Sequence, residues 1–143
     1  MDLIVTATSA AGNKVLDIMK VKPGCVITDV ARPLDMSAED VAKRPDVLVI
    51  EGGVVRVPGD VDFGLNFGFP PKTAYACMSE TMILALEGRF EDYTLGRTLS
   101  LDKVREIREL AAKHGFELAG FRSFERAVDE ATIERVRQLS QAG

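Results

Sequence analysis

The sequence predicts an α/β fold in which a parallel sheet is followed by a helical tail. Three early runs are short, apolar and rich in β-branched residues, and turn-forming residues separate them: Leu3–Thr8, Cys25–Val30 and Val47–Ile50. Continuous apolar runs of this length are typical of parallel strands that are covered on both faces. The second half of the chain has apolar residues at three-and-four spacing, which predicts helices.

The composition is that of one soluble globular domain over residues 1–143 and excludes several classes of function. The chain is 46% hydrophobic and 28% charged, with a formal net charge of −4. It offers no basic field for nucleic acid and no apolar run long enough for a membrane span. One histidine and two separated cysteines predict no metal site. We expect a cytoplasmic protein, because both cysteines lie in apolar segments that suit a reducing compartment.

Short turns are predicted to connect the strands. Lys14–Met19 predicts a brief helix, and Ser37 predicts the cap of a helical turn before the third strand. The pair Gly52-Gly53, between two apolar runs, predicts a two-residue hairpin that adds an antiparallel edge. The glycine- and proline-rich Pro58–Lys72 predicts a long irregular connection.

Helices dominate the second half. Thr73–Glu87 predicts a largely buried helix, because its apolar residues lie on nearly every side. A second helix is expected to begin after Ser100 and to end at His114, where the histidine caps the carboxyl end. Phe116–Phe121 predicts a short strand, and Asp129 predicts the start of an amphipathic terminal helix.

Polar or small residues stand at the end of each predicted strand. Thr8 and Ser9 end the first strand, Asp29 lies at the end of the second, and Gly52 and Gly53 follow the third. Open α/β sheets bind ligands at the carboxyl ends of their strands, so these five residues are candidate cofactor-binding residues. From the residues alone, loop capping is favoured for the two hydroxyls, and anchoring of the next loop is favoured for the aspartate. For the two glycines, the residues favour neither interpretation over the other: a simple turn, or a close approach of the backbone to a ligand.

One expected feature of a dinucleotide-binding fold has no match. Such folds begin with a glycine-rich turn, G-x-G-x-x-G, where backbone N–H groups and a helix N-terminus receive the diphosphate. No segment of this sequence has that pattern. We therefore predict the later half of a doubly wound parallel sheet, without the glycine-rich first βαβ half.

Several phrases resemble the carboxyl-terminal part of the long-chain acyl-carrier-protein reductases: DLIVTATS, CVITDVARPLD, VLVIEGGVV, TAYACMSETMILALEGRFEDYTLGR and KHGFELAG. Those enzymes form fatty aldehydes from acyl thioesters with NADPH. The likeness runs from Asp2 to about Phe121 and is most specific over Ala74–Arg97. More distantly, the strand ends look like those of shikimate or quinate dehydrogenases and glutamyl-tRNA reductases. The resemblance implies a Rossmann-like fold, NADP as cofactor, and an acyl thioester or acyl carrier protein as partner.

The same resemblance implies a catalytic role for Cys77. In that family the cysteine of an A-C-x-x-E phrase takes up the acyl group, and here the phrase is Ala76–Glu80. The residues themselves place Cys77 in the first turn of a helix, where unpaired N–H groups favour a thiolate. Glu80 shares its face and is interpreted as a capping-box carboxylate or a proton handler. The alternative is that Cys77 is a small buried hydrophobic residue.

The sequence therefore predicts one function and leaves two alternatives open. The first is an NAD(P)H-dependent acyl-thioester reductase that works through a Cys77 acyl-enzyme. The second is a dehydrogenase of the shikimate or quinate type, in which hydride passes directly to a keto group and the cysteine only packs. The third is a non-catalytic oligomerisation or binding module, because half a parallel sheet leaves a strand unpaired. We expect either a homo-oligomer or an N-terminal half that is missing here.

Overall fold

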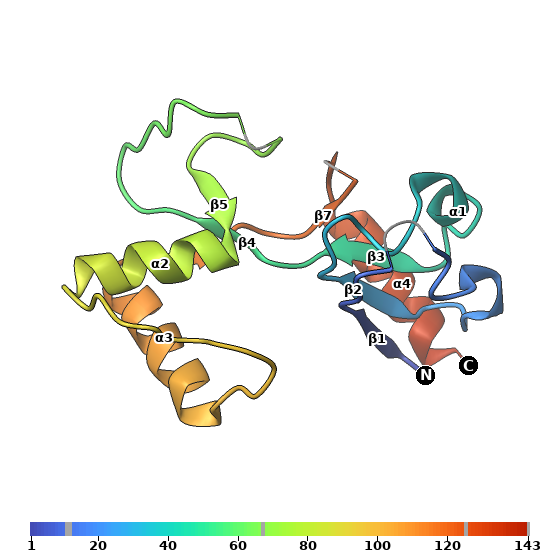
Figure 1. Ribbon diagram of the computed structural model, residues 1–143. Helices are drawn as coiled ribbons and strands as arrows, with labels where there is room; N and C mark the ends of the chain where they lie inside the picture. The colour runs from blue at the N-terminus through green and yellow to red at the C-terminus, as the bar shows by residue number, and fades with distance from the viewer. Residues whose placement is uncertain (11–12, 67, 125, 143) are drawn as a thin grey trace. The chain divides into compact units, whose positions relative to one another are not determined.

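The computed structural model describes residues 1–10, 13–66, 68–124 and 126–142, which fall into two compact units. Unit 1 comprises Met1–Gly52 and Gly120–Gly143, and unit 2 comprises Gly53–Ala119. Each unit has its own sheet and its own hydrophobic core (Figure 1). The fold is mixed α/β, as the sequence predicts. That both units belong to one NAD(P)-binding domain over residues 1–143 stays a prediction.

Unit 1 is built on a three-stranded parallel sheet. Its strands are β1 (Leu3–Thr6), β2 (Val26–Asp29) and β3 (Leu48–Glu51), in the order β1-β2-β3. Both neighbouring pairs are parallel and in register over four residues. The prediction of a parallel sheet from the three apolar runs is thus confirmed, and the sheet with its helices is consistent with half of a Rossmann-like domain and a helical tail.

The two faces of this sheet are covered unequally. One face packs on a core that includes Ile18, Cys25 and Ile27. Helix α4 (Glu130–Gln141) contacts β3 and covers part of the other face through Val136. The prediction that every strand is covered on both faces is wrong for β1, whose large apolar side chains at alternate positions are exposed: Leu3 59% and Val5 61%. No described element covers that face of β1.

The connections in unit 1 are short and capped. The predicted helix at Lys14–Met19 is only the single turn η1 (Ile18–Lys20). Helix α1 (Ala38–Ala42) begins where predicted, because the Ser37 side chain accepts a hydrogen bond from an N–H of its first turn. Asp129 caps α4 in the same way. The hairpin of β7 (Arg122–Ser123) and β8 (Arg126–Ala127) precedes α4.

One position in unit 1 requires glycine, because the backbone of another segment lies very close to it. Gly24 has φ +78°, and a Cβ added there would lie 2.2 Å from the backbone nitrogen of Ser140 in α4. A side chain at this position would clash with backbone, which cannot move aside as a flexible side chain does. The turn before β2 and the end of α4 therefore pack directly against each other.

Unit 2 contains a separate antiparallel sheet. Its strands are β4 (Val54–Arg56), β5 (Thr73–Tyr75) and β6 (Glu117–Leu118), in the order β5-β4-β6. The predicted Gly52-Gly53 hairpin is wrong, because β3 and β4 belong to different sheets. Its core is formed by Val57, Ala74, Ile83 and Phe116.

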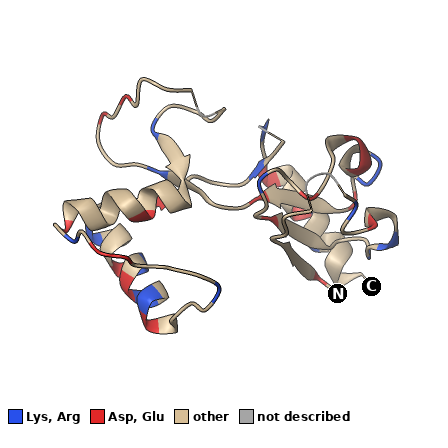
Figure 2. Ribbon diagram, in the orientation of Figure 1, with Lys and Arg blue, Asp and Glu red and all other residues tan. Residues whose placement is uncertain are grey.

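The helices of unit 2 begin and end close to their predicted positions. Helix α2 (Ala76–Leu86) begins three residues later than predicted, because β5 pairs with β4. It is also less buried than predicted, since only Ser79, Ile83 and Leu84 are buried. Helix α3 (Leu101–Lys113) follows Ser100, whose side chain makes no cap hydrogen bond, and ends at His114. Figure 2 shows charge mixed over α3, whereas α2 carries a single charged residue.

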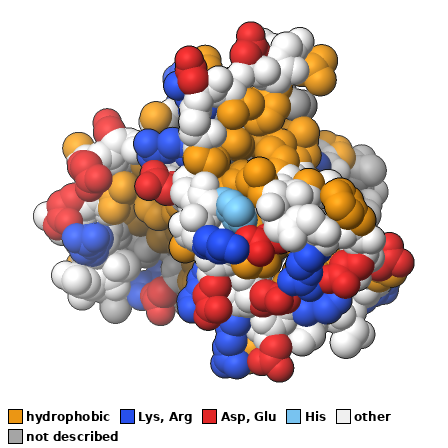
Figure 3. All heavy atoms as spheres, turned by 90° about the vertical axis from the view of Figure 1, so that its left-hand side faces the viewer, with side chains coloured by type: hydrophobic (Ala, Val, Ile, Leu, Met, Phe, Trp, Pro, Cys, Tyr) orange, Lys and Arg blue, Asp and Glu red, His pale blue; other side chains and the backbone are white. Residues whose placement is uncertain are grey.

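Large apolar side chains remain exposed on unit 2. Figure 3 shows hydrophobic side chains gathered on one face beside the single histidine. Across unit 2, the large apolar side chains that are more than half exposed are Leu65, Leu86, Phe90, Leu95, Leu99, Leu101 and Leu118. Within the described residues, no helix is both long enough and apolar enough to cross a membrane.

Candidate functional site

A row of polar residues closes the carboxyl edge of the parallel sheet. Thr6 of β1 is in register with Asp29 of β2, which is in register with Glu51 of β3. Register partners in adjacent strands point to the same face, so the three side chains form one row. This strand-end row lies one pleat beyond the apolar row of Ile4, Ile27 and Val49, which belongs to the core of unit 1.

Asp29 anchors the loop that follows β2. Its side chain is 1% exposed; Oδ1 accepts a hydrogen bond from the Ala31 N–H at 3.1 Å and Oδ2 accepts one from the Met36 N–H at 2.9 Å. The carboxylate therefore holds both ends of this loop and compensates two buried donors. This contact supports the interpretation of Asp29 as a loop anchor that the residues favoured.

Thr8 is tied to the same loop from the end of β1. Its hydroxyl donates to Asp35 Oδ1 at 2.6 Å, and its N–H donates to Oδ2 of the same carboxylate at 3.1 Å. The hydroxyl also accepts from the Ala10 N–H. Ser9 is exposed beside it. The prediction that Thr8 and Ser9 end the first strand is wrong, because β1 ends at Thr6 and both residues lie in the loop that follows; the Thr8 hydroxyl is engaged in fixing the loops to each other.

Arg32 joins the second strand end to the third. Its Nη2 lies 3.5 Å from Glu51 Oε2 and donates to the Gly52 carbonyl at 3.4 Å. A Cβ added to Gly52 would lie 3.1 Å from Val30 Cγ2, so the missing side chain leaves room for the loop after β2. The loops after all three strands are thus linked by polar contacts at one edge of the sheet.

The Thr6 hydroxyl is the unusual member of the strand-end row. Thr6 is 6% exposed, and its Oγ1 has no hydrogen-bond partner among the described residues. Buried polar groups without a partner are rare, and ordered water or a bound molecule commonly supplies the missing hydrogen bond. The strand-end row therefore has one hydrogen-bonding group without a partner among the described residues, beside two carboxylates that are already engaged.

Cys77 stands at the start of α2 in unit 2. It is the second residue of the helix, and its side chain is exposed. The helix has no side-chain cap, and its first N–H, from Ala76, donates to the Gly53 carbonyl at 2.7 Å. The next two N–H groups, of Cys77 and Met78, have no partner inside the helix. Gly53, with φ +80°, therefore directs its carbonyl at the helix end that carries the cysteine.

Glu80 does not cap the helix, and its other interpretation, as a proton handler, stays a prediction. Its Oε1 accepts a hydrogen bond from the Thr94 hydroxyl at 2.8 Å, which ties α2 to the loop before α3. The capping-box interpretation is wrong, because the carboxylate bonds a side chain rather than an N–H of the first turn. The prediction that Cys77 is a buried packing residue is also wrong, since the other cysteine, Cys25, is the buried one.

The predicted site residues divide between the two units. Thr8, Ser9, Asp29 and Gly52 lie at the strand ends of unit 1, whereas Gly53, Cys77 and Glu80 lie in unit 2. Sequence reasoning missed three strand-end residues: Thr6, Arg32 and Glu51. For Thr6 and Glu51 the available signal was that each apolar run ends on a polar residue, in LIVT, VITD and LVIE, whereas Arg32 lies beyond the second run.

The strand ends fit only part of a nicotinamide dinucleotide. The partnerless Thr6 hydroxyl suits a sugar hydroxyl or a carboxamide, which donate and accept hydrogen bonds. The diphosphate lacks its usual site, because within residues 1–10, 13–66, 68–124 and 126–142 no strand enters a helix through a glycine-rich turn.

Comparisons with known proteins link the chain to two enzymes. It is 41% identical over 139 residues to "Aminotransferase PigE" of Serratia sp., and 28% identical over 121 residues to "Long-chain acyl-[acyl-carrier-protein] reductase" of Synechococcus elongatus. The alignments cover 95% and 81% of this chain but only 16% and 35% of the relatives. No protein-family model matches. The likeness to the reductase suggests an oxidoreductase-like domain.

Proposed function

We propose that this chain supplies the acyl-accepting cysteine of an NAD(P)H-dependent reductase that converts an acyl thioester to an aldehyde. The observation that carries the proposal is the exposed Cys77 thiol in the uncapped first turn of α2. The similarity to an acyl-carrier-protein reductase supports it. The name of the other relative is compatible, because an aldehyde is a substrate class that aminotransferases aminate.

The chain's own chemistry is an acyl transfer. The Cys77 thiolate attacks the carbonyl carbon of the thioester, a new carbon–sulfur bond forms, and the bond to the leaving thiol breaks. The proton lost by the Cys77 thiol goes to the departing thiolate. The N–H groups of the first turn of α2 that lack a partner inside the helix can donate to the negative charge that develops on the carbonyl oxygen. A bound nicotinamide cofactor supplies the hydride that takes a thioester to an aldehyde.

Two variants test the proposal in the full natural protein. Cys77→Ser is expected to lower aldehyde formation from an acyl thioester and NADPH by about a hundredfold or more, because serine is a far weaker nucleophile at neutral pH. Cys25→Ala, the matched control, removes a thiol that is 0% exposed and leaves the rate within about twofold. Undiminished aldehyde formation by Cys77→Ser would contradict the proposal.

A substrate comparison separates the reductase from a dehydrogenase of the shikimate or quinate type. The reductase consumes NADPH with acyl thioesters and not with cyclic keto acids. A dehydrogenase shows the reverse preference, and Cys77→Ser leaves its rate unchanged, because that chemistry needs no nucleophile on the protein.

A further inference from the structure

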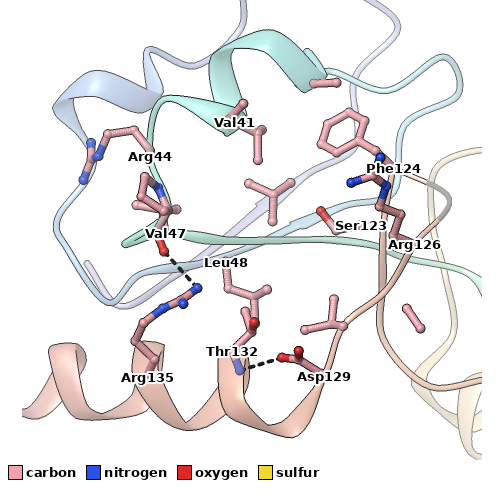
Figure 4. A pocket seen from close by; sticks show the side chains of 16 residues that line it. Val41, Arg44, Val47, Leu48, Ser123, Phe124, Arg126, Asp129, Thr132 and Arg135 are labelled. Atoms are coloured by element: carbon pink, nitrogen blue, oxygen red, sulfur yellow. Dashed lines mark hydrogen bonds between the residues drawn. The ribbon is translucent and has the colours of Figure 1, made fainter.

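A cavity of about 570 Å³ lies in unit 1, beside the outer edge of β3 (Figure 4). Helix α1, the β7–β8 hairpin and the first turns of α4 enclose it together with β3. Its volume falls within the range of small-molecule sites, about 300–1,000 Å³. It shares no lining residue with the strand-end row of Thr6, Asp29 and Glu51, so it is a separate site.

The middle of this β3-edge cavity is apolar. Val41 comes from α1, Leu48 from β3 and Phe124 from the turn of the β7–β8 hairpin, and Figure 4 shows their side chains around the centre. Val47 and Val128 extend the same surface. An apolar surface assembled from three elements suits the hydrocarbon part of a ligand, since it is already shaped before binding.

The ends of the cavity are cationic. Figure 4 shows Arg135 of α4 at one end and Arg126 of β8 at the other, with the apolar centre between them. Neither guanidinium forms a salt bridge with a described residue, and Arg135 donates only a long hydrogen bond, 3.5 Å, to the Pro45 carbonyl. Arg135 interacts with a carboxylate only through the charge of Asp129, beyond salt-bridge distance, so both guanidinium groups can still pair with an anionic ligand.

The other charged residues of the cavity are already committed. Arg44 donates to Asp46 and to the carbonyls of Ile18 and Val21, so its guanidinium is fixed within the fold. The Asp129 carboxylate accepts the Thr132 N–H, and this contact, with a smaller contribution from the positive charge of Arg135, holds the pKa of Asp129 below its usual range. The two guanidinium groups of Arg126 and Arg135 outweigh the single carboxylate of Asp129, so the cavity favours an anionic ligand.

From this arrangement we propose that the β3-edge cavity binds a small molecule with an apolar middle and an anionic group at each end. One carboxylate or phosphate pairs with Arg135 and the other with Arg126, while the hydrocarbon between them lies on Leu48 and Phe124. The proposal is independent of Cys77 and of any cofactor at the strand ends.

The test is isothermal titration calorimetry, which measures the affinity of the chain for aliphatic dicarboxylates from succinate to dodecanedioate. We expect one length to bind best, and we expect the monocarboxylate and the diol of that length to bind about tenfold and a hundredfold more weakly, because each lost charged pair weakens binding about tenfold. Arg126→Gln and Arg135→Gln are each expected to weaken dicarboxylate binding about tenfold.

Arg137→Gln is the matched control, because Arg137 lies on α4, pairs with Glu134 and does not line the cavity. It is expected to leave the affinity unchanged, and thermal unfolding confirms that all three variants fold. The proposal is overturned if no dicarboxylate binds, if the diol binds as well as the dicarboxylate, or if Arg137→Gln weakens binding as much as the other two variants.

Discussion

Replacing Asp29 by asparagine tests how the strand ends are held in place. The carboxylate is 1% exposed and accepts one N–H on each oxygen, from Ala31 at 3.1 Å and Met36 at 2.9 Å. In Asp29→Asn one of these oxygens becomes an NH₂ group that faces a donor. One buried N–H then loses its acceptor, and an unsatisfied buried donor costs about 1–3 kcal/mol. We expect the free energy of unfolding to fall by that amount.

Urea denaturation followed by circular dichroism measures this change. Asp35→Asn is the matched control, because Asp35 also accepts two hydrogen bonds, but both are exposed. Water replaces a lost exposed hydrogen bond, so the control is expected to lose less than about 1 kcal/mol. If Asp29→Asn loses no more stability than Asp35→Asn, burial is not the reason that the loop depends on this carboxylate.

Three further predictions concern pH and backbone packing. Lys113 and His114 hold the pKa of Glu87 below its usual range, so this carboxylate stabilises the fold above its unfolded-state pKa and the contribution disappears as pH falls; Glu87→Gln should flatten the acid side of a plot of melting temperature against pH. Burial raises the pKa of Tyr93 to about 12, so Tyr93→Phe should remove the highest-pH component of an ultraviolet tyrosine titration. Gly24→Ala should destabilise the chain more than Gly59→Ala in thermal unfolding, because both positions have positive φ but only the first would clash with backbone.

The sequence predicted the elements whose signals are local. The apolar runs predicted the parallel sheet, and Ser37 and Asp129 predicted helix starts that the structure contains. Each of these signals depends on residues within one turn or one strand. For the same reason, the sequence predicted correctly that Cys77 lies in the first turn of a helix.

Features that depend on pairing between distant segments were not predicted. Thr73–Tyr75 has the composition of a helix start but forms β5, because it pairs with β4 almost twenty residues earlier in the chain. The Gly52-Gly53 pair looks like a hairpin, yet the strands on either side join different sheets. The strand-end row needs the register of three strands, and no single run contains that register.

The sequence also could not predict which faces of the strands are buried by other elements. The run in β1 is as apolar as that in β2, but Leu3 and Val5 are exposed because β1 is at the edge of the sheet and α4 covers the opposite end. An apolar run shows that a strand suits burial, whereas its neighbours decide whether it is buried.

The central claim, that Cys77 accepts an acyl group, is tested most directly by mass spectrometry of the intact protein. Incubation with an acyl thioester and without NADPH is expected to add the mass of one acyl group, on the peptide that contains Cys77. Hydroxylamine, which cleaves thioesters, should remove it, and Cys77→Ser should not acquire it. An adduct of equal yield in Cys77→Ser, or no adduct in the unaltered protein, would contradict the account.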